Sequence, residues 1–140
     1  MYARRLVQIG GVINWLFVIF HLSFWKLFGW PQSIALWSPV NRTVVQVLNI
    51  HAAYVLAVFG FLSFAFRDEM STTRMGRSVG MAIAVFWVLR GVNQLVFEDI
   101  SSGESWAITA VCLGVAALYV IPSMSPKKKV FYPLQAANES

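Results

Sequence analysis

Several polar side chains that can bind ligands or react lie inside otherwise apolar stretches of this chain. Arg90, Gln94 and Glu98 follow one another at intervals of four residues, so on a helix they form one stripe. Asn14 and His21 are seven residues apart and share a helical face in the same way. Arginine holds anions, and histidine titrates near neutral pH and ligates metals. These residue types predict a polar site, and its location depends on the helices that carry them.

Four apolar runs carry these residues: Leu6–Phe24, Val44–Phe66, Val79–Phe97 and Trp106–Met124. Each is about 19 residues or longer, which is enough for a helix to cross a hydrocarbon core of ~30 Å. Charged residues make up 12% of the chain, against about 25% in soluble domains. The sequence therefore predicts an all-α, polytopic membrane protein. We expect a four-transmembrane-helix bundle over residues 1–125 and a polar cytoplasmic tail over residues 126–140.

Basic residues favour one side of the predicted membrane. The N-terminal segment, the second loop and the tail hold Arg4, Arg5, Arg67, Arg74, Arg77, Lys127, Lys128 and Lys129, whereas the first loop holds only Lys26 and Arg42 and the third loop none. The positive-inside rule then predicts a multi-pass protein of the cell (inner) membrane with cytoplasmic N- and C-termini. Membrane borders and anionic lipids explain the net charge of +5, so we expect the lipid bilayer as a partner and no nucleic acid.

This orientation predicts a shared depth for two of the polar residues. His51 and Arg90 would each lie about 10 Å below the outer border, at a rise of 1.5 Å per residue. An arginine at that depth costs about 2.5–3.5 kcal/mol unless it finds water or a partner, so its side chain should turn into the bundle. We expect its partner to be Glu98 through Gln94, Asp99, or an acidic ligand.

The polar residues allow three interpretations. The first is a structural network in a subunit of a larger membrane complex. The second is a small-molecule site in the outer half of the bundle for a quinone, an isoprenoid or a lipid, formed by His21, His51, Arg90, Gln94, Glu98 and Asn14. The third is a redox or metal protein in which His21 and His51 ligate haem, or a metal with Glu98 as third ligand. We expect an accessory or ligand-binding protein that is not an enzyme on its own.

Small residues mark one face on each of the last two runs. These faces carry Gly76, Gly80 and Ala84 in the third run, and Ala107, Ala110, Gly114 and Ala117 in the fourth. Small residues let helices approach closely in lipid, so both faces are expected to pack inside the bundle. The alternative is a docking face for a partner protein or for a second copy in a homo-oligomer. Cys112 is the single cysteine, so no disulfide can form within the chain.

The end of the first run and the start of the first loop carry a resemblance to a known family. The segment is Phe24, Trp25, Lys26, Leu27, Phe28, Gly29, Trp30 and Pro31. It resembles the segment that closes the first helix in DoxX-like membrane proteins, which are small four-span proteins, some of them linked to quinone-dependent oxidation. The resemblance implies a four-helix bundle with an accessory membrane role and transfers no catalytic residue. Within the first loop, Pro31 and Pro39 are expected to begin and end a short helix.

Overall fold

The computed structural model describes residues 2–98 and 100–124. Its long helices are α1 (Tyr2–Leu22), α3 (Pro39–Ala65), α5 (Arg74–Phe97) and α6 (Gly103–Met124), and its short helices are α2 (Phe24–Leu27), η1 (Gln32–Ile34) and α4 (Glu69–Thr72). Each long helix is apolar enough to cross a membrane, with a mean hydropathy between 1.5 and 2.0. The predicted all-α, four-span architecture is confirmed. The predicted tail, residues 126–140, lies outside the described residues.

Capping side chains explain where two of the spans begin. Ser38 Oγ accepts the backbone N–H of Asn41 at 3.2 Å, and Pro39 occupies the first turn of α3. Thr73 Oγ1 accepts the N–H of Gly76 at 2.9 Å and starts α5. The expectation that Pro39 ends a short helix is therefore wrong. Proline has no N–H to lose in the first turn of a helix, so it begins α3 instead.

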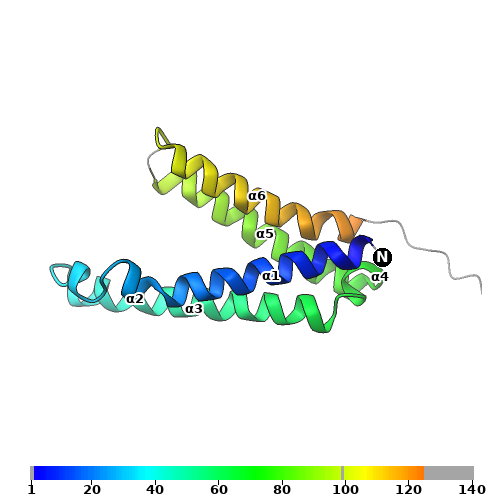
Figure 1. Cartoon of the computed structure of the whole chain (residues 1–140), viewed down its shortest axis with the longest axis horizontal. Helices are drawn as coiled ribbons and strands as arrows, with labels where there is room; N and C mark the ends of the chain where they lie inside the picture. The colour runs from blue at the N-terminus through cyan, green and yellow to red at the C-terminus, as the bar shows by residue number, and fades with distance from the viewer. Residues whose placement is uncertain (1, 99, 125–140) are drawn as a thin grey trace, which may run out of the picture.

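The long helices form two pairs that diverge from one end of the molecule (Figure 1). α1 packs along α3, α5 packs along α6, and the two pairs meet mainly through α1 and α6. They touch near the end where the N-terminus lies, and they separate towards η1 and towards the start of α6. The bundle is therefore V-shaped.

Small residues set the close approach of α5 to α6. A Cβ placed on Gly80 would lie 2.5 Å from Ser123 Oγ, and one placed on Gly91 would lie 3.3 Å from the Cβ of Cys112. Larger side chains at these positions would hold the two helices further apart. The predicted burial of the small-residue face on α5 is confirmed, since Gly76, Gly80 and Ala84 are all buried.

The small-residue face on α6 lies elsewhere than expected. Its members are exposed: Ala107, Ala110, Gly114 and Ala117. Their expected packing inside the bundle is wrong, because α6 turns a different face to its neighbours, carrying Ser105, Thr109, Cys112, Ala116 and Tyr119. The alternative interpretation, a docking face, stays a prediction.

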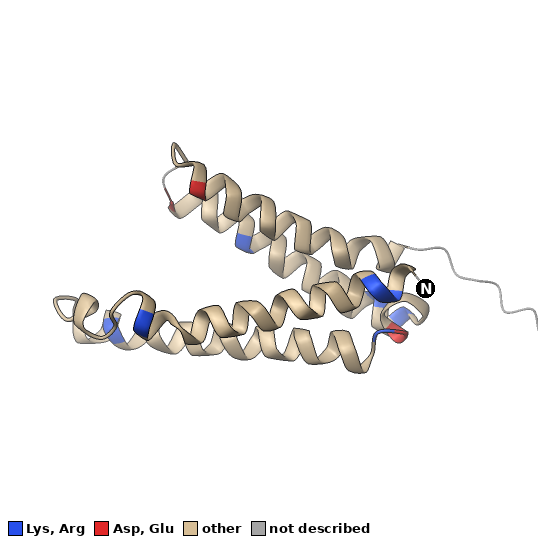
Figure 2. Cartoon of the chain, in the orientation of Figure 1, with Lys and Arg blue, Asp and Glu red and all other residues tan. Residues whose placement is uncertain are grey.

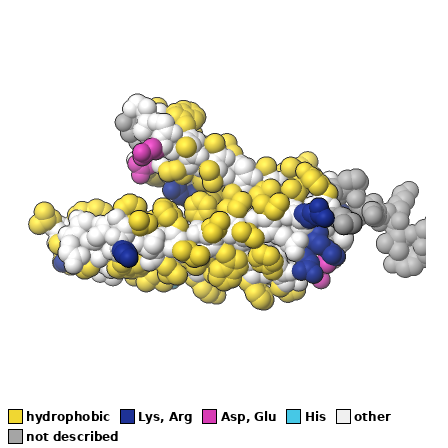
Figure 3. All heavy atoms as spheres, viewed as in Figure 1, with side chains coloured by type: hydrophobic (Ala, Val, Ile, Leu, Met, Phe, Trp, Pro, Cys, Tyr) yellow, Lys and Arg dark blue, Asp and Glu magenta, His cyan; other side chains and the backbone are white. Residues whose placement is uncertain are grey.

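The surface is apolar around the helices and charged near their ends. Large apolar side chains such as Tyr54, Phe61 and Val96 are exposed, and Figure 3 shows hydrophobic atoms covering most of the visible face. Lys and Arg gather at the end where the N-terminus lies (Figure 2), and there Arg4 Nη2 pairs with Asp68 Oδ1 at 2.5 Å. Exposed apolar helices of this length are suited to a lipid environment, so the chain is an integral membrane protein in contact with the bilayer.

Candidate functional site: a cleft between the helix pairs

Two cavities lie between the helix pairs where these diverge. The smaller, about 370 Å³, is lined by α1, α2, α3 and α5, and the larger, about 750 Å³, by α1, α2, α5 and α6. The residues Phe17, Phe20, Phe24 and Arg90 line both cavities, so the two spaces adjoin. Their volumes fall in the range of about 300–1,000 Å³ that is typical of small-molecule sites. We call the combined space the cleft.

A phenylalanine stripe separates the two cavities, with Phe17 and Phe20 on α1 and Phe24 at the start of α2. The three residues are spaced by three and four positions in the chain. Their rings meet edge to face, with centroids 6.1 Å apart for Phe17 and Phe20 and 4.9 Å apart for Phe20 and Phe24. Phe17 also packs against the Trp87 ring of α5 at 4.8 Å. The stripe gives each cavity an aromatic wall.

Arg90 brings a positive charge to the place where the cavities adjoin. Its Nη1 donates to Gln94 Oε1 at 2.8 Å, which is the i to i+4 contact that the spacing predicts. Glu98 and Glu104 also line the larger cavity, but within residues 2–98 and 100–124 no carboxylate forms an ion pair with Arg90. Asp99, the other expected partner, lies outside the described residues. Figure 3 shows acidic atoms at the mouth of the notch between the arms and basic atoms deeper in it.

His21 lines the smaller cavity and is held by the neighbouring span. Asn49 Nδ2 donates to the His21 carbonyl at 2.8 Å, so Asn49 Oδ1, 2.7 Å from His21 Nδ1, faces the ring as an acceptor. The ring must therefore donate from Nδ1, which leaves Nε2 as its second polar atom. The imidazole also stacks on Phe24, with ring centroids 5.0 Å apart. This two-bond clamp ties α1 to α3 beside the cleft.

His51 lines neither cavity. Its side chain is exposed, and its Nδ1 lies 2.8 Å from the Val47 carbonyl of the same helix. Asn49 turns towards His21, and a residue two positions further is rotated by about 200° around a helix. The two histidines therefore belong to different environments. Within the described part of the chain, no three His, Cys, Asp or Glu side chains are grouped closely enough to hold a metal, which disfavours a metal site formed by His21, His51 and Glu98. Haem ligation by the two histidines stays a prediction.

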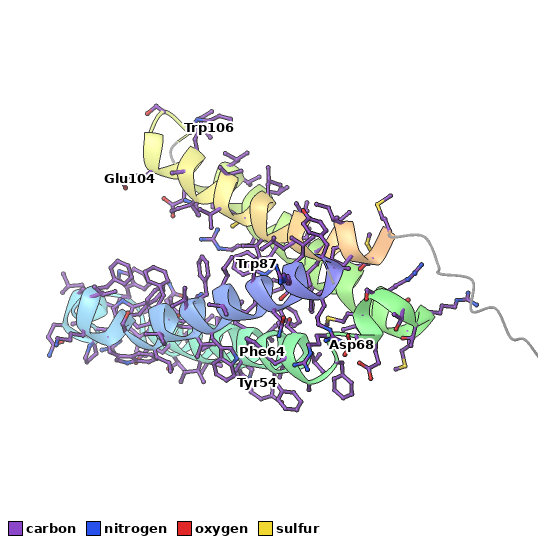
Figure 4. All side chains as sticks on the ribbon, turned by 45° about the vertical axis from the view of Figure 1, so that its right-hand side comes forward. Tyr54, Phe64, Asp68, Trp87, Glu104 and Trp106 are labelled. Atoms are coloured by element: carbon purple, nitrogen blue, oxygen red, sulfur yellow. The ribbon has the colours of Figure 1, made fainter. Side chains whose placement is uncertain are left out.

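Asn14 lies at the junction of the helix pairs, where it bonds to α5 and α6 and, through Tyr119, is connected to α3. Its Nδ2 donates to the Gly10 carbonyl and to Tyr119 Oη, both at 2.8 Å, and its Oδ1 accepts from Trp87 Nε1 at 3.3 Å. Tyr119 Oη is in turn 2.7 Å from Ser63 Oγ. Asn14, Ser63 and Tyr119 are fully buried, and Figure 4 shows Trp87 between the two arms. We call Asn14, Ser63, Trp87 and Tyr119 the junction network.

The structure thus divides the sequence-predicted site. Arg90, Gln94 and Glu98 line the larger cavity together, His21 shares the smaller one with Arg90, Asn14 belongs to the junction network, and His51 lies apart. Sequence reasoning missed the phenylalanine stripe, although its spacing of three and four residues marks one face. It also missed Ser63, Trp87 and Tyr119, since these residue types are common in spans and carry no spacing signal.

Comparisons with known proteins found no relative of this chain. No protein-family model, no curated protein and no solved structure matches the chain. The resemblance to DoxX-like proteins stays a prediction.

Proposed function

We propose that this chain is a small ligand-binding membrane protein that holds an amphipathic molecule of the bilayer, such as a quinone, an isoprenoid or a lipid, in the cleft. The observation that carries this proposal is the cleft itself. Its two cavities of about 370 and 750 Å³ have aromatic walls and a small set of polar groups. An apolar pocket with a few polar groups is the usual form of a small-molecule site, and here lipid surrounds the spans that form it.

The polar groups of the cleft fit an amphipathic ligand better than a purely apolar one. Arg90 can bind a polar head, and Gln94 holds its guanidinium in place. The phenylalanine stripe and Trp87 offer apolar contact to a chain or ring. The proposal is one of binding and includes no catalytic step.

Filling the larger cavity should remove the bound molecule. Ala107 lines that cavity, so in Ala107→Trp the indole would occupy part of its volume. We expect the amount of small molecule that co-purifies after mild detergent extraction, measured by mass spectrometry, to fall at least several-fold. Ala110→Trp is the matched control, because Ala110 is exposed on the same helix and lines neither cavity.

Two outcomes would contradict the proposal. One is equal small-molecule content in the wild type and Ala107→Trp. The other is a cleft filled by a helix of another protein, seen as a stable larger complex on native gels whose formation Ala107→Trp blocks. That second outcome would support the accessory-subunit role instead.

We also propose that the charged end around Arg4 and Asp68 faces the cytoplasm, because basic residues gather at that end (Figure 2). Arg4 and Arg67 lie beside Asp68, Arg77 donates to the Ser71 carbonyl, and Arg74 begins α5. Cysteines placed at Ser33 in the first loop and at Thr72 in α4 test this orientation, since both positions are exposed and the native Cys112 is buried. On intact cells, a membrane-impermeant maleimide should label Ser33→Cys and not Thr72→Cys. The reverse pattern of labelling would overturn the orientation.

A further inference from the structure

We infer that the molecule held in the cleft is a two-chain lipid with a phosphate head group, its phosphate on Arg90 and one chain in each cavity. This inference rests on the proposed function and names its ligand class.

Arg90 has hydrogen-bonding capacity that its described contacts do not use. A guanidinium carries five N–H donors, and the described contacts of Arg90 use one of them, on Gln94 Oε1. Gln94 is neutral, so it cannot compensate the charge. A permanently charged group within a span is stabilised by water or by a counter-charge, and no described carboxylate supplies a counter-charge by direct pairing. A phosphate does so with two parallel hydrogen bonds, which the carbonyl of a quinone cannot match in charge.

Arg90 lies where the two apolar cavities adjoin. Among the residues that the structure describes, Arg90 is the one charged side chain that lines both cavities, since Glu98 and Glu104 line only the larger one. A lipid head group bound to Arg90 would therefore lie at the point from which its acyl chains can enter both cavities. The phenylalanine stripe lies between the two routes, so a molecule with two chains can place one on each side of α1.

Two carboxylates lie near the mouth of the cleft. Glu98 and Glu104 lie on the larger cavity beyond Arg90 towards the loop between α5 and α6. Their carboxylates disfavour further negative charge there and favour a cationic substituent on the phosphate. Phosphatidylethanolamine combines two chains, one phosphate and one ammonium, so it is the probe that the charges fit.

Native mass spectrometry of the purified full chain in detergent provides the test. The probes are phosphatidylethanolamine, diacylglycerol with the same chains and no phosphate, lysophosphatidylethanolamine with one chain, and ubiquinone. We expect phosphatidylethanolamine to bind at least about tenfold more tightly than each of the other three. The reason is that a charged hydrogen bond to the phosphate and the burial of a second apolar chain each raise the binding affinity by about that factor.

Variants of Arg90 test the head-group contact. Arg90→Gln should abolish the preference for phosphatidylethanolamine over diacylglycerol, and Arg90→Lys should keep part of it through its charge. Arg42→Gln is the matched control, because Arg42 lies at the start of α3 and lines neither cavity. Equal binding of phosphatidylethanolamine and diacylglycerol, or a preference that survives Arg90→Gln, would overturn the inference.

A block of the smaller cavity tests the two-chain arrangement without altering Arg90. Ala52 lines this cavity, so Ala52→Trp should reduce phosphatidylethanolamine binding to the level of the one-chain lipid. Ala82→Trp serves as its control, since Ala82 is exposed on α5 outside both cavities. An unchanged ratio of two-chain to one-chain binding in Ala52→Trp would reject the arrangement. Tight ubiquinone binding without lipid preference would overturn this inference alone, whereas the absence of binding by all four probes would overturn the proposed function as well.

Discussion

Replacing Asn14 with leucine should lower the free energy of unfolding by about 2–4 kcal/mol, which is among the largest effects we expect of a single substitution in this chain. The amide makes three hydrogen bonds, to Gly10, Trp87 and Tyr119. Leucine has a similar size but leaves the buried Tyr119 hydroxyl and the Trp87 indole N–H with fewer hydrogen-bond partners. Water is not available inside the bundle to replace the amide. Because all four spans meet at the junction network, the loss should loosen the contact between the two helix pairs.

Thermal or denaturant-induced unfolding in detergent measures this effect, with Asn93→Leu as the matched control. Asn93 is exposed on α5 and has no described side-chain partner, so leucine there should leave stability unchanged or raise it. Equal stability of the Asn14 and Asn93 variants would show that the junction network contributes little.

Replacing Gly10 with alanine should destabilise the protein by about 1–3 kcal/mol through overpacking. A Cβ at Gly10 would lie 2.7 Å from the Cε2 and Cζ atoms of the Tyr119 ring. That ring is fully buried, and its hydroxyl contacts both Asn14 and Ser63, so it cannot move aside without breaking those bonds. We therefore expect α1 and α6 to be forced apart at the junction of the helix pairs.

Gly114→Ala isolates the effect of packing from that of helix propensity. Gly114 also lies within a span, but nothing approaches within 4 Å of a Cβ placed there. Alanine favours a helix over glycine by up to about 1 kcal/mol, so this variant should be as stable as the wild type or more stable. Melting temperatures of the two variants in the same detergent give the comparison. A destabilised Gly114→Ala would point to a contact on this face, such as the docking surface that its small residues allow.

The sequence by itself determined where the four spans lie in the chain. A run of about 20 apolar residues can satisfy its backbone in lipid only as a helix, so apolar length alone predicts each span. It also determined the contact between Arg90 and Gln94, because a spacing of four residues places two side chains together on any helix. Such features depend only on residues near one another in the chain.

The tertiary structure decided which helix faces meet, and this divided the predicted site. The sequence offers His21 and His51 alike as ligands, yet Asn49 bonds to His21 beside the cleft, whereas His51 lies on the outside of α3. Asn14 meets Tyr119 across 105 positions of the chain, a contact that no local spacing encodes. The angle between helix pairs follows from such distant contacts, with Gly10 admitting the Tyr119 ring at one end and phenylalanine rings lying between the arms further out. Local sequence therefore determines the helices, whereas packing between distant residues decides where a cleft opens.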